Sequence, residues 1–239
     1  MFRLVLGAHL ACAFGATALF WVPVFAAKGG PLHVGAGRLY ARLIYATAIT
    51  GAPLAILLLV SAPDPATTRT AAFLAYLVTI LVQPVFHGVR VVRTRAGGAV
   101  GSPLHTALSL AAIVAGLAIG AAAVVWREWP FLLVSPIGPV MGVRALLYSS
   151  RLSFPGWANR ENSTGKSFPA WREEHIVAMV VSGIAVHTAM LVFGTSRTLH
   201  MTFTGAAAYV PWLLPTVLGL PVLLWKIRRD RRALAPPSR

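Results

Sequence analysis

Long apolar runs, each separated from the next by a short polar connection, fill most of this chain. Six are long and a seventh is broken by prolines; they cover about residues 4–26, 34–60, 71–92, 104–126, 130–149, 173–194 and 204–225. Runs of this kind reach the roughly 20 residues that an α-helix needs to cross a bilayer. Their polarity does not alternate at every second residue, as it would in the strands of a membrane β-barrel. The pattern predicts an all-α, polytopic transmembrane helix bundle with about seven spans, in one domain over residues 1–239.

The run at 130–149 is the weakest of the predicted spans. Pro136, Gly138, Pro139 and Arg144 interrupt its apolar pattern. A proline inside a helix removes a backbone hydrogen bond and clashes with the preceding turn. We expect a bent or broken helix that still crosses the membrane, because otherwise the basic cluster at 226–232 would change sides.

The distribution of positive charge predicts the orientation of the chain. The net charge of +15 would suggest a nucleic-acid partner in a soluble protein, but here only 11% of the residues are charged and 57% are hydrophobic. Seven crossings place 17 of the 21 lysines and arginines on one side, and leave four on the other: Arg3, Arg69, Arg127 and Arg197. Cytoplasmic connections carry the excess of basic residues. We therefore expect an external N-terminus, a cytoplasmic loop at about 150–172, a basic cytoplasmic tail at 226–239 and no nucleic-acid partner.

Histidines give the clearest chemical signal. Four fall at the cytoplasmic ends of the predicted spans, namely His33, His87, His105 and His175, while His9 and His187 fall in the outer half. Imidazole is the usual proximal ligand of b-type haem and a common ligand of zinc and copper. In the simpler interpretation, each histidine lies at the headgroup level or hydrogen-bonds to a neighbouring helix.

Two kinds of centre are compatible with these residues. Arg38 lies at a similar depth to the inner histidines, and a guanidinium can pair with a haem propionate. Alternatively, His33, His175 and Glu174 would hold zinc, copper or iron without a haem. The single cysteine, Cys12, excludes a disulfide within the chain and a covalently attached c-type haem. Walker, H-E-x-x-H and G-x-S-x-G patterns are all missing from the sequence.

Two short motifs stand at the start of predicted spans. The first is the run Lys28-Gly29-Gly30-Pro31-Leu32-His33 with Gly37-Arg38-Leu39-Tyr40, and the second is Trp171-x-x-x-His175. Together they resemble a family of bacterial multi-spanning membrane proteins catalogued as domain of unknown function 2306. The resemblance covers about Phe25 to Phe193. It implies a multi-pass protein of the bacterial cytoplasmic membrane and emphasises His33 and His175, but the family lends no activity. In construction it is loosely similar to cytochrome b561-type proteins.

Three hypotheses follow. The leading one is a haem b protein of the cytoplasmic membrane that passes electrons to a redox partner or a quinone, with His33, His87, His105 and His175 as candidate inner ligands and His9 with His187 as an outer pair. The second is a non-haem metal enzyme acting on a lipid or a quinone. The third is a transporter, or a structural protein that forms a homo-oligomer or a subunit of a membrane complex. Whether the chain is an enzyme stays open.

Overall fold

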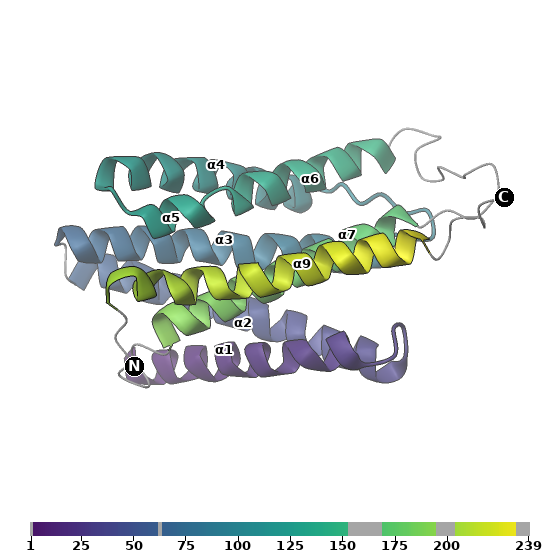
Figure 1. Cartoon of the computed structure of the whole chain (residues 1–239), viewed down its shortest axis with the longest axis horizontal. Coiled ribbons are helices and arrows are strands. Elements are labelled where there is room, and N and C mark those ends of the chain that lie inside the picture. Colours follow the sequence, from purple (N-terminus) through teal and green to yellow (C-terminus); the bar gives the residue numbers. More distant parts are fainter. Residues whose placement is uncertain (1, 62–63, 153–168, 195–203, 233–239) are drawn as a thin grey trace.

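The computed structural model describes residues 2–61, 64–152, 169–194 and 204–232, and within these ranges the chain forms helices and no strand (Figure 1). Seven segments within the described ranges are long and apolar enough to cross a membrane, which agrees with the predicted number of spans. The helices are α1 (Phe2–Phe25), α2 (Pro31–Ser61), α3 (Pro65–Arg93), α4 (Pro103–Trp126), α5 (Trp129–Val134), α6 (Ile137–Leu152), α7 (Ala170–Ala189), a π-helical turn (Met190–Gly194), a 3₁₀ turn (Gly205–Tyr209) and α9 (Val210–Arg232).

Caps and prolines fix where the helices begin. Asp64 precedes Pro65 and accepts hydrogen bonds from the backbone N–H groups of Ala66 and Thr67 at the start of α3. Ser102 precedes Pro103 in the same way, and its hydroxyl accepts from the N–H of His105 at 3.1 Å. A side-chain acceptor followed by proline is a favoured helix start. The cap at Ser102 therefore holds His105 in the first turn of α4.

The fifth span is broken, as its prolines predict. Segment α5 ends at Val134, and α6 begins at Ile137, immediately after Pro136. Backbone groups released by such a break need partners, because the bilayer offers no water. Tyr76 of α3 supplies them: its hydroxyl lies 3.1 Å and 2.9 Å from the carbonyl oxygens of Val134 and Ser135, and it accepts from the N–H of Gly138 at 3.0 Å.

The helices form three groups, and α3 belongs to the central one. In Figure 1, α1 and α2 lie on one side, α4, α5 and α6 lie on the other, and α3, α7 and α9 lie between them. In the apolar stretch of α3 that is long enough to span a membrane, 56% of the residues are buried, against 11% in the corresponding stretches of the first and last spans. Helix α3 is thus the centre of the bundle.

Glycines let the backbones of α4 and α6 approach closely. A Cβ atom on Gly116 would lie 2.3 Å from the ring of Pro139, and one on Gly142 would lie 2.4 Å from the carbonyl oxygen of Ser109. These contacts leave no space for a methyl group. The small residues of α4 therefore serve packing within this chain.

Basic side chains gather where α1, α3, α6 and α9 end and where α2, α4 and α7 begin. We name this region the basic end and define it by Lys28, Arg95, Arg144, Arg172 and Lys226. Contacts join its helices: the Arg95 guanidinium lies 5.4 Å from the Trp171 ring centre, and Arg172 lies 3.5 Å from Asp230. Helix α1 begins at the opposite end (Figure 1).

Two of the predicted connections change in part. Helix α9 continues to Arg232, so the predicted tail at 226–239 is helical at its start. Helix α7 begins at Ala170, inside the predicted loop at 150–172. Residues 153–168, which make up most of that loop, lie outside the described residues.

The Tyr76→Phe variant tests the break in the fifth span. Removal of the hydroxyl leaves two carbonyl groups and one N–H group without that partner in a buried position, so the protein should lose about 1–3 kcal/mol of stability. Thermal unfolding of the detergent-purified protein measures this loss. The control is Tyr45→Phe in α2, which removes a hydroxyl outside this contact; equal melting temperatures for both variants would contradict the assignment.

Candidate functional site

All four predicted inner histidines belong to helices that meet at the basic end, and the structure arranges them in two groups. His33 of α2 and His175 of α7 form one group, with ring centres 6.4 Å apart. His87 of α3 and His105 of α4 form the other, with ring nitrogens 3.0 Å apart. The groups have different surroundings, and each is described below.

The first group, which we name the imidazole pair, consists of His33 and His175. Nδ1 of His33 lies 3.0 Å from the carbonyl oxygen of Pro23, and Nδ1 of His175 lies 2.9 Å from that of Gly88. A carbonyl oxygen only accepts, so each Nδ1 must carry the proton that it donates. In a neutral imidazole this leaves Nε2 with a free lone pair. Both rings are therefore held in the tautomer that can bind a metal ion through Nε2.

Unsatisfied carbonyl groups at the end of α1 position His33. The last carbonyl groups of a helix have no partner within the helix. Here the Lys28 ammonium donates to the carbonyl oxygens of Pro23 and Val24, at 2.7 Å and 2.6 Å, and His33 donates to Pro23 as well. The lysine and histidine of the first motif thus hold the turn between α1 and α2.

A close approach of α3 and α7 positions His175. A Cβ atom on Gly88 would lie 2.6 Å from the terminal carbon of Met179 and 3.0 Å from Cβ of Ala178. Glycine at this position lets α7 come near enough for His175 to reach the Gly88 carbonyl oxygen. The two carbonyl acceptors belong to α1 and α3, so four helices determine the geometry of the imidazole pair.

The second group, which we name the buried dyad, consists of His87 and His105. The two residues are 0% and 1% exposed, and Nδ1 of His87 faces Nε2 of His105. Nε2 of His87 lies 3.3 Å from Oε2 of Glu174 in α7. The rings of His87 and of Tyr148 in α6 are also nearly perpendicular, with ring centres 5.7 Å apart.

An arginine in the broken fifth span anchors Glu174. Nε of Arg144 donates to Oε2 of Glu174 at 2.9 Å, and an Nη atom of Arg144 lies 2.8 Å from Oε1. The same guanidinium also contacts Glu173 at 3.3 Å. Two contacts between one guanidinium and one carboxylate are the strong form of this ion pair. They fix the position of the Glu174 carboxylate.

The predicted non-haem set of His33, His175 and Glu174 is divided between the two groups. Successive residues of a helix point about 100° apart. Glu174 consequently faces His87 and Arg144, whereas His175 faces His33. Among the described residues, no group of three or more His, Cys, Asp and Glu residues could hold a metal ion.

The structure does not bring the predicted outer pair together. Nδ1 of His9 lies 3.1 Å from the Thr47 carbonyl oxygen and 3.2 Å from the Thr50 hydroxyl of α2. Nε2 of His187 instead accepts from the indole N–H of Trp21 at 3.1 Å. Trp21 follows His9 in α1 by twelve residues, or about 18 Å of helix rise.

Arg38, the predicted partner of a haem propionate, is exposed. It follows His33 by five residues in α2, so it lies about 140° around the helix from that histidine. Its side chain therefore starts from a different face of α2 than the imidazole pair.

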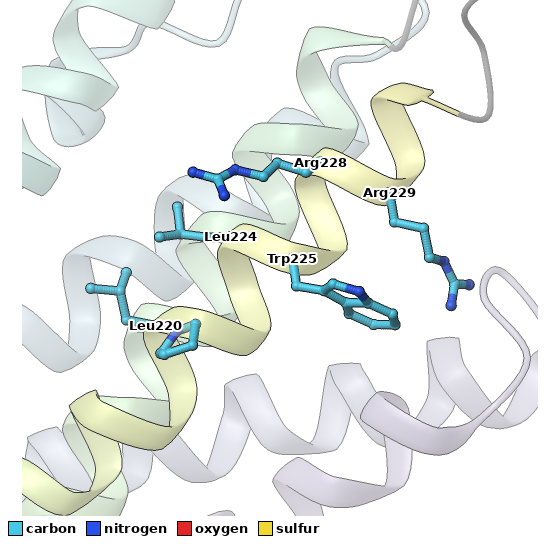
Figure 2. Close-up of a pocket in the computed structure, with 6 residues that line it drawn as sticks. Leu220, Leu224, Trp225, Arg228 and Arg229 are labelled. Carbon is cyan, nitrogen blue, oxygen red and sulfur yellow. The ribbon is translucent and has the colours of Figure 1, made fainter.

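A groove on α9 lies at the same end but contains none of these histidines. It is lined by Leu220, Pro221, Leu224, Trp225, Arg228 and Arg229. Figure 2 shows Arg228 and Arg229 directed to different sides of α9, and the Arg229 guanidinium lies 4.9 Å from the Trp225 ring centre. All of its lining residues belong to one helix, so the groove lacks a second wall.

Two further residues of the site, Arg144 and Gln83, stand out in the sequence as polar residues within apolar spans, but the sequence does not identify their partners. Arg144 interrupts an apolar span, and such an arginine needs a carboxylate partner. Gln83 lies one turn before His87 in α3, is buried, and donates to Ser109 at 3.4 Å. The partner of each residue belongs to a distant part of the chain, so sequence periodicity could not name it.

The chain matches none of the family models, curated proteins or solved structures with which it was compared. The resemblance in its two short motifs therefore stays a prediction, and the function is argued from the geometry above.

A double-mutant cycle tests the Arg144–Glu174 pair. The variants Arg144→Gln, Glu174→Gln and the double variant should give a coupling free energy of about 1–3 kcal/mol, because one carboxylate is mostly buried. The control cycle uses Arg69 and Glu128, which are 3.1 Å apart and both about one-third exposed; exposed pairs couple by less than about 1 kcal/mol. Chemical denaturation in mixed micelles measures both cycles, and equal couplings would contradict the structure.

Proposed function

We propose that this chain is an integral protein of the bacterial cytoplasmic membrane that transfers electrons through a b-type haem bound by His33 and His175. In this proposal the N-terminus is external and the basic end is cytoplasmic. Seven apolar spans support the membrane location. The distribution of lysines and arginines supports the orientation: seven crossings place 17 on the side of the basic end and four on the other side, and cytoplasmic connections carry the excess of basic residues.

The geometry of the imidazole pair carries the proposal. Two imidazoles that hold one ion through Nε2 must lie side by side, because each such bond is only about 2 Å long. The ring centres of His33 and His175 are 6.4 Å apart, so the two rings are close enough to hold one ion. In both residues Nδ1 donates to a backbone carbonyl group, which is the usual way in which proteins orient a ligating histidine.

Positive charge near the pair fits the acidic groups of a haem. Lys28 lies between the spans, and its partial burial, together with the positive charge of Lys226, lowers the pKa of its ammonium group. A propionate placed near these two cations would relieve that repulsion. Lys226 also binds Asp230, one turn further along α9, so the cations at this end are already partly paired.

A haem held in this position would supply one-electron chemistry at its iron. His33 of α2 and His175 of α7 would hold it through Nε2, and two carbonyl groups from α1 and α3 would fix the orientation of their rings. Because the pair lies at the basic end, the electron would be exchanged with a quinone or a redox partner at the cytoplasmic face.

The test is an oxidised-minus-dithionite-reduced absorption spectrum of the purified protein, with iron, copper and zinc measured on the same sample. We expect a b-type α-band and about one iron per chain. His33→Ala and His175→Ala should each abolish the band, because either change removes an axial ligand. The matched controls are His9→Ala and His187→Ala, which remove partly buried histidines outside the pair and should retain it.

Other results would favour the alternatives. Bound zinc, copper or iron without a haem band would support a non-haem metal enzyme that uses the same two imidazoles. A spectrum without bands and a sample without metal would contradict both metal proposals. Stoichiometric copurification of another subunit in that case would support a structural role in a membrane complex.

A further inference from the structure

The buried dyad of His87 and His105 has no part in the proposed electron transfer, and one of its atoms lacks a partner. Nδ1 of His105 makes no hydrogen bond with any residue that the structure describes, although the side chain is only 1% exposed. A buried polar atom without a partner costs about 1–3 kcal/mol. Such an atom marks a place where a ligand that can form a hydrogen bond would be stabilised.

The charges around the dyad determine which nitrogen atoms carry protons. Both oxygen atoms of Glu174 accept from the Arg144 guanidinium, so this carboxylate is also the acceptor in its contact with His87. Nε2 of His87 must then donate to Glu174. In a neutral His87, Nδ1 is therefore an acceptor, and Nε2 of His105 must donate to it. By this order, Nδ1 of His105 carries a free lone pair.

We propose that His87 and His105 form one buried proton-acceptor site, and that the proton enters at Nδ1 of His105. An N–H bond forms at that atom, while the Nε2–H bond of His105 breaks and its proton passes to Nδ1 of His87. His105 ends as a neutral imidazole of the opposite tautomer. His87 ends as an imidazolium whose two N–H groups face His105 and Glu174. One proton is taken up, and no electrons are exchanged.

Several charged and titratable groups surround the dyad, and Glu174 is the one that hydrogen-bonds to it. Helix α7 contributes Glu174, α6 contributes Arg144 and Tyr148, and α3 contributes Arg90; Glu173 of α7 contacts the same Arg144, while His175 is turned to His33. The Arg90 guanidinium is directed to the carbonyl oxygens of Ala99, Val100 and Gly101 in the connection to α4. Two carboxylates thus balance two guanidiniums, and of these groups only Glu174 hydrogen-bonds to His87.

The proposal is independent of the haem, and its test does not use absorbance. The experiment is a pH titration of the full chain in lipid nanodiscs, with both ring nitrogens of histidine labelled with ¹⁵N. The nitrogen chemical shift distinguishes a protonated ring nitrogen from a bare one. The variants His87→Gln and His105→Gln assign the signals of the dyad. The control is His9→Asn, which removes a histidine that contacts Thr47 and Thr50 and should leave the signals of the dyad unchanged.

On acidification we expect Nδ1 of His87 and of His105 to gain protons together, while Nε2 of His105 loses its own. The proton goes to His87 in this scheme, so infrared spectra should show no new band of a protonated carboxyl group over the same pH range. The proposal is overturned if His105 keeps its tautomer, if both imidazoles become cationic, or if the carboxyl band appears.

A charge variant gives a second test. Glu174→Gln keeps the size of the side chain but removes the negative charge beside His87, so proton uptake should require at least a tenfold higher proton concentration. Glu173→Gln, which changes the neighbouring carboxylate, should shift the midpoint less. Equal midpoints in the wild type and Glu174→Gln would contradict the proposal; if that variant does not fold, the titration of the wild-type protein decides alone.

Discussion

The ion pair between Arg144 and Glu174 is the contact on which the arrangement of the basic end depends. An unpaired charge is unfavourable inside an apolar bundle, and each of these two is tolerated because the other neutralises it. Arg144 belongs to the broken fifth span and Glu174 to the first turns of α7, so the pair joins two helices that lie far apart in sequence. Glu174 also accepts from His87 of α3, which in turn meets His105 of α4. One carboxylate therefore orders polar groups from four helices.

Unpaired carbonyl groups impose a second constraint. A bilayer cannot solvate the ends and breaks of helices, so polar side chains must reach them. Tyr76 does so at the break in the fifth span, and Lys28 with His33 does so at the end of α1. For His33 this contact has two consequences, because the bond that satisfies Pro23 also leaves Nε2 available. A structural contact and a ligand geometry are thus compatible in one residue.

The coarse architecture could be predicted from hydropathy, and the finer arrangement could not. The number of spans, the break near Pro136 and the collection of four histidines at one end all follow from runs, prolines and distances along helices. The division of these histidines into two groups does not. It depends on how each helix is rotated about its axis, which is set by packing between distant segments, such as the approach of α7 to Gly88.

The separation of Glu174 from His175 illustrates the same limit. Their adjacency in sequence suggested a common metal site with His33. Adjacent side chains of a helix point about 100° apart, but this spacing does not say which neighbouring helix each side chain meets. Only the packed bundle reveals that α3 and α6 take the carboxylate while α2 takes the imidazole. The outer pair failed to meet for a related reason, since His9 packs against α2 and His187 reaches α1 near its other end.

Electron paramagnetic resonance of the oxidised protein, with ¹⁵N-labelled histidine, tests the central claim most directly. If His33 and His175 hold one haem, the low-spin ferric signal should couple to nitrogens from two imidazoles, and substitution of either residue by alanine should abolish that signal. A ferric signal coupled to a single imidazole, or one unchanged by both substitutions, would contradict the assignment of this pair.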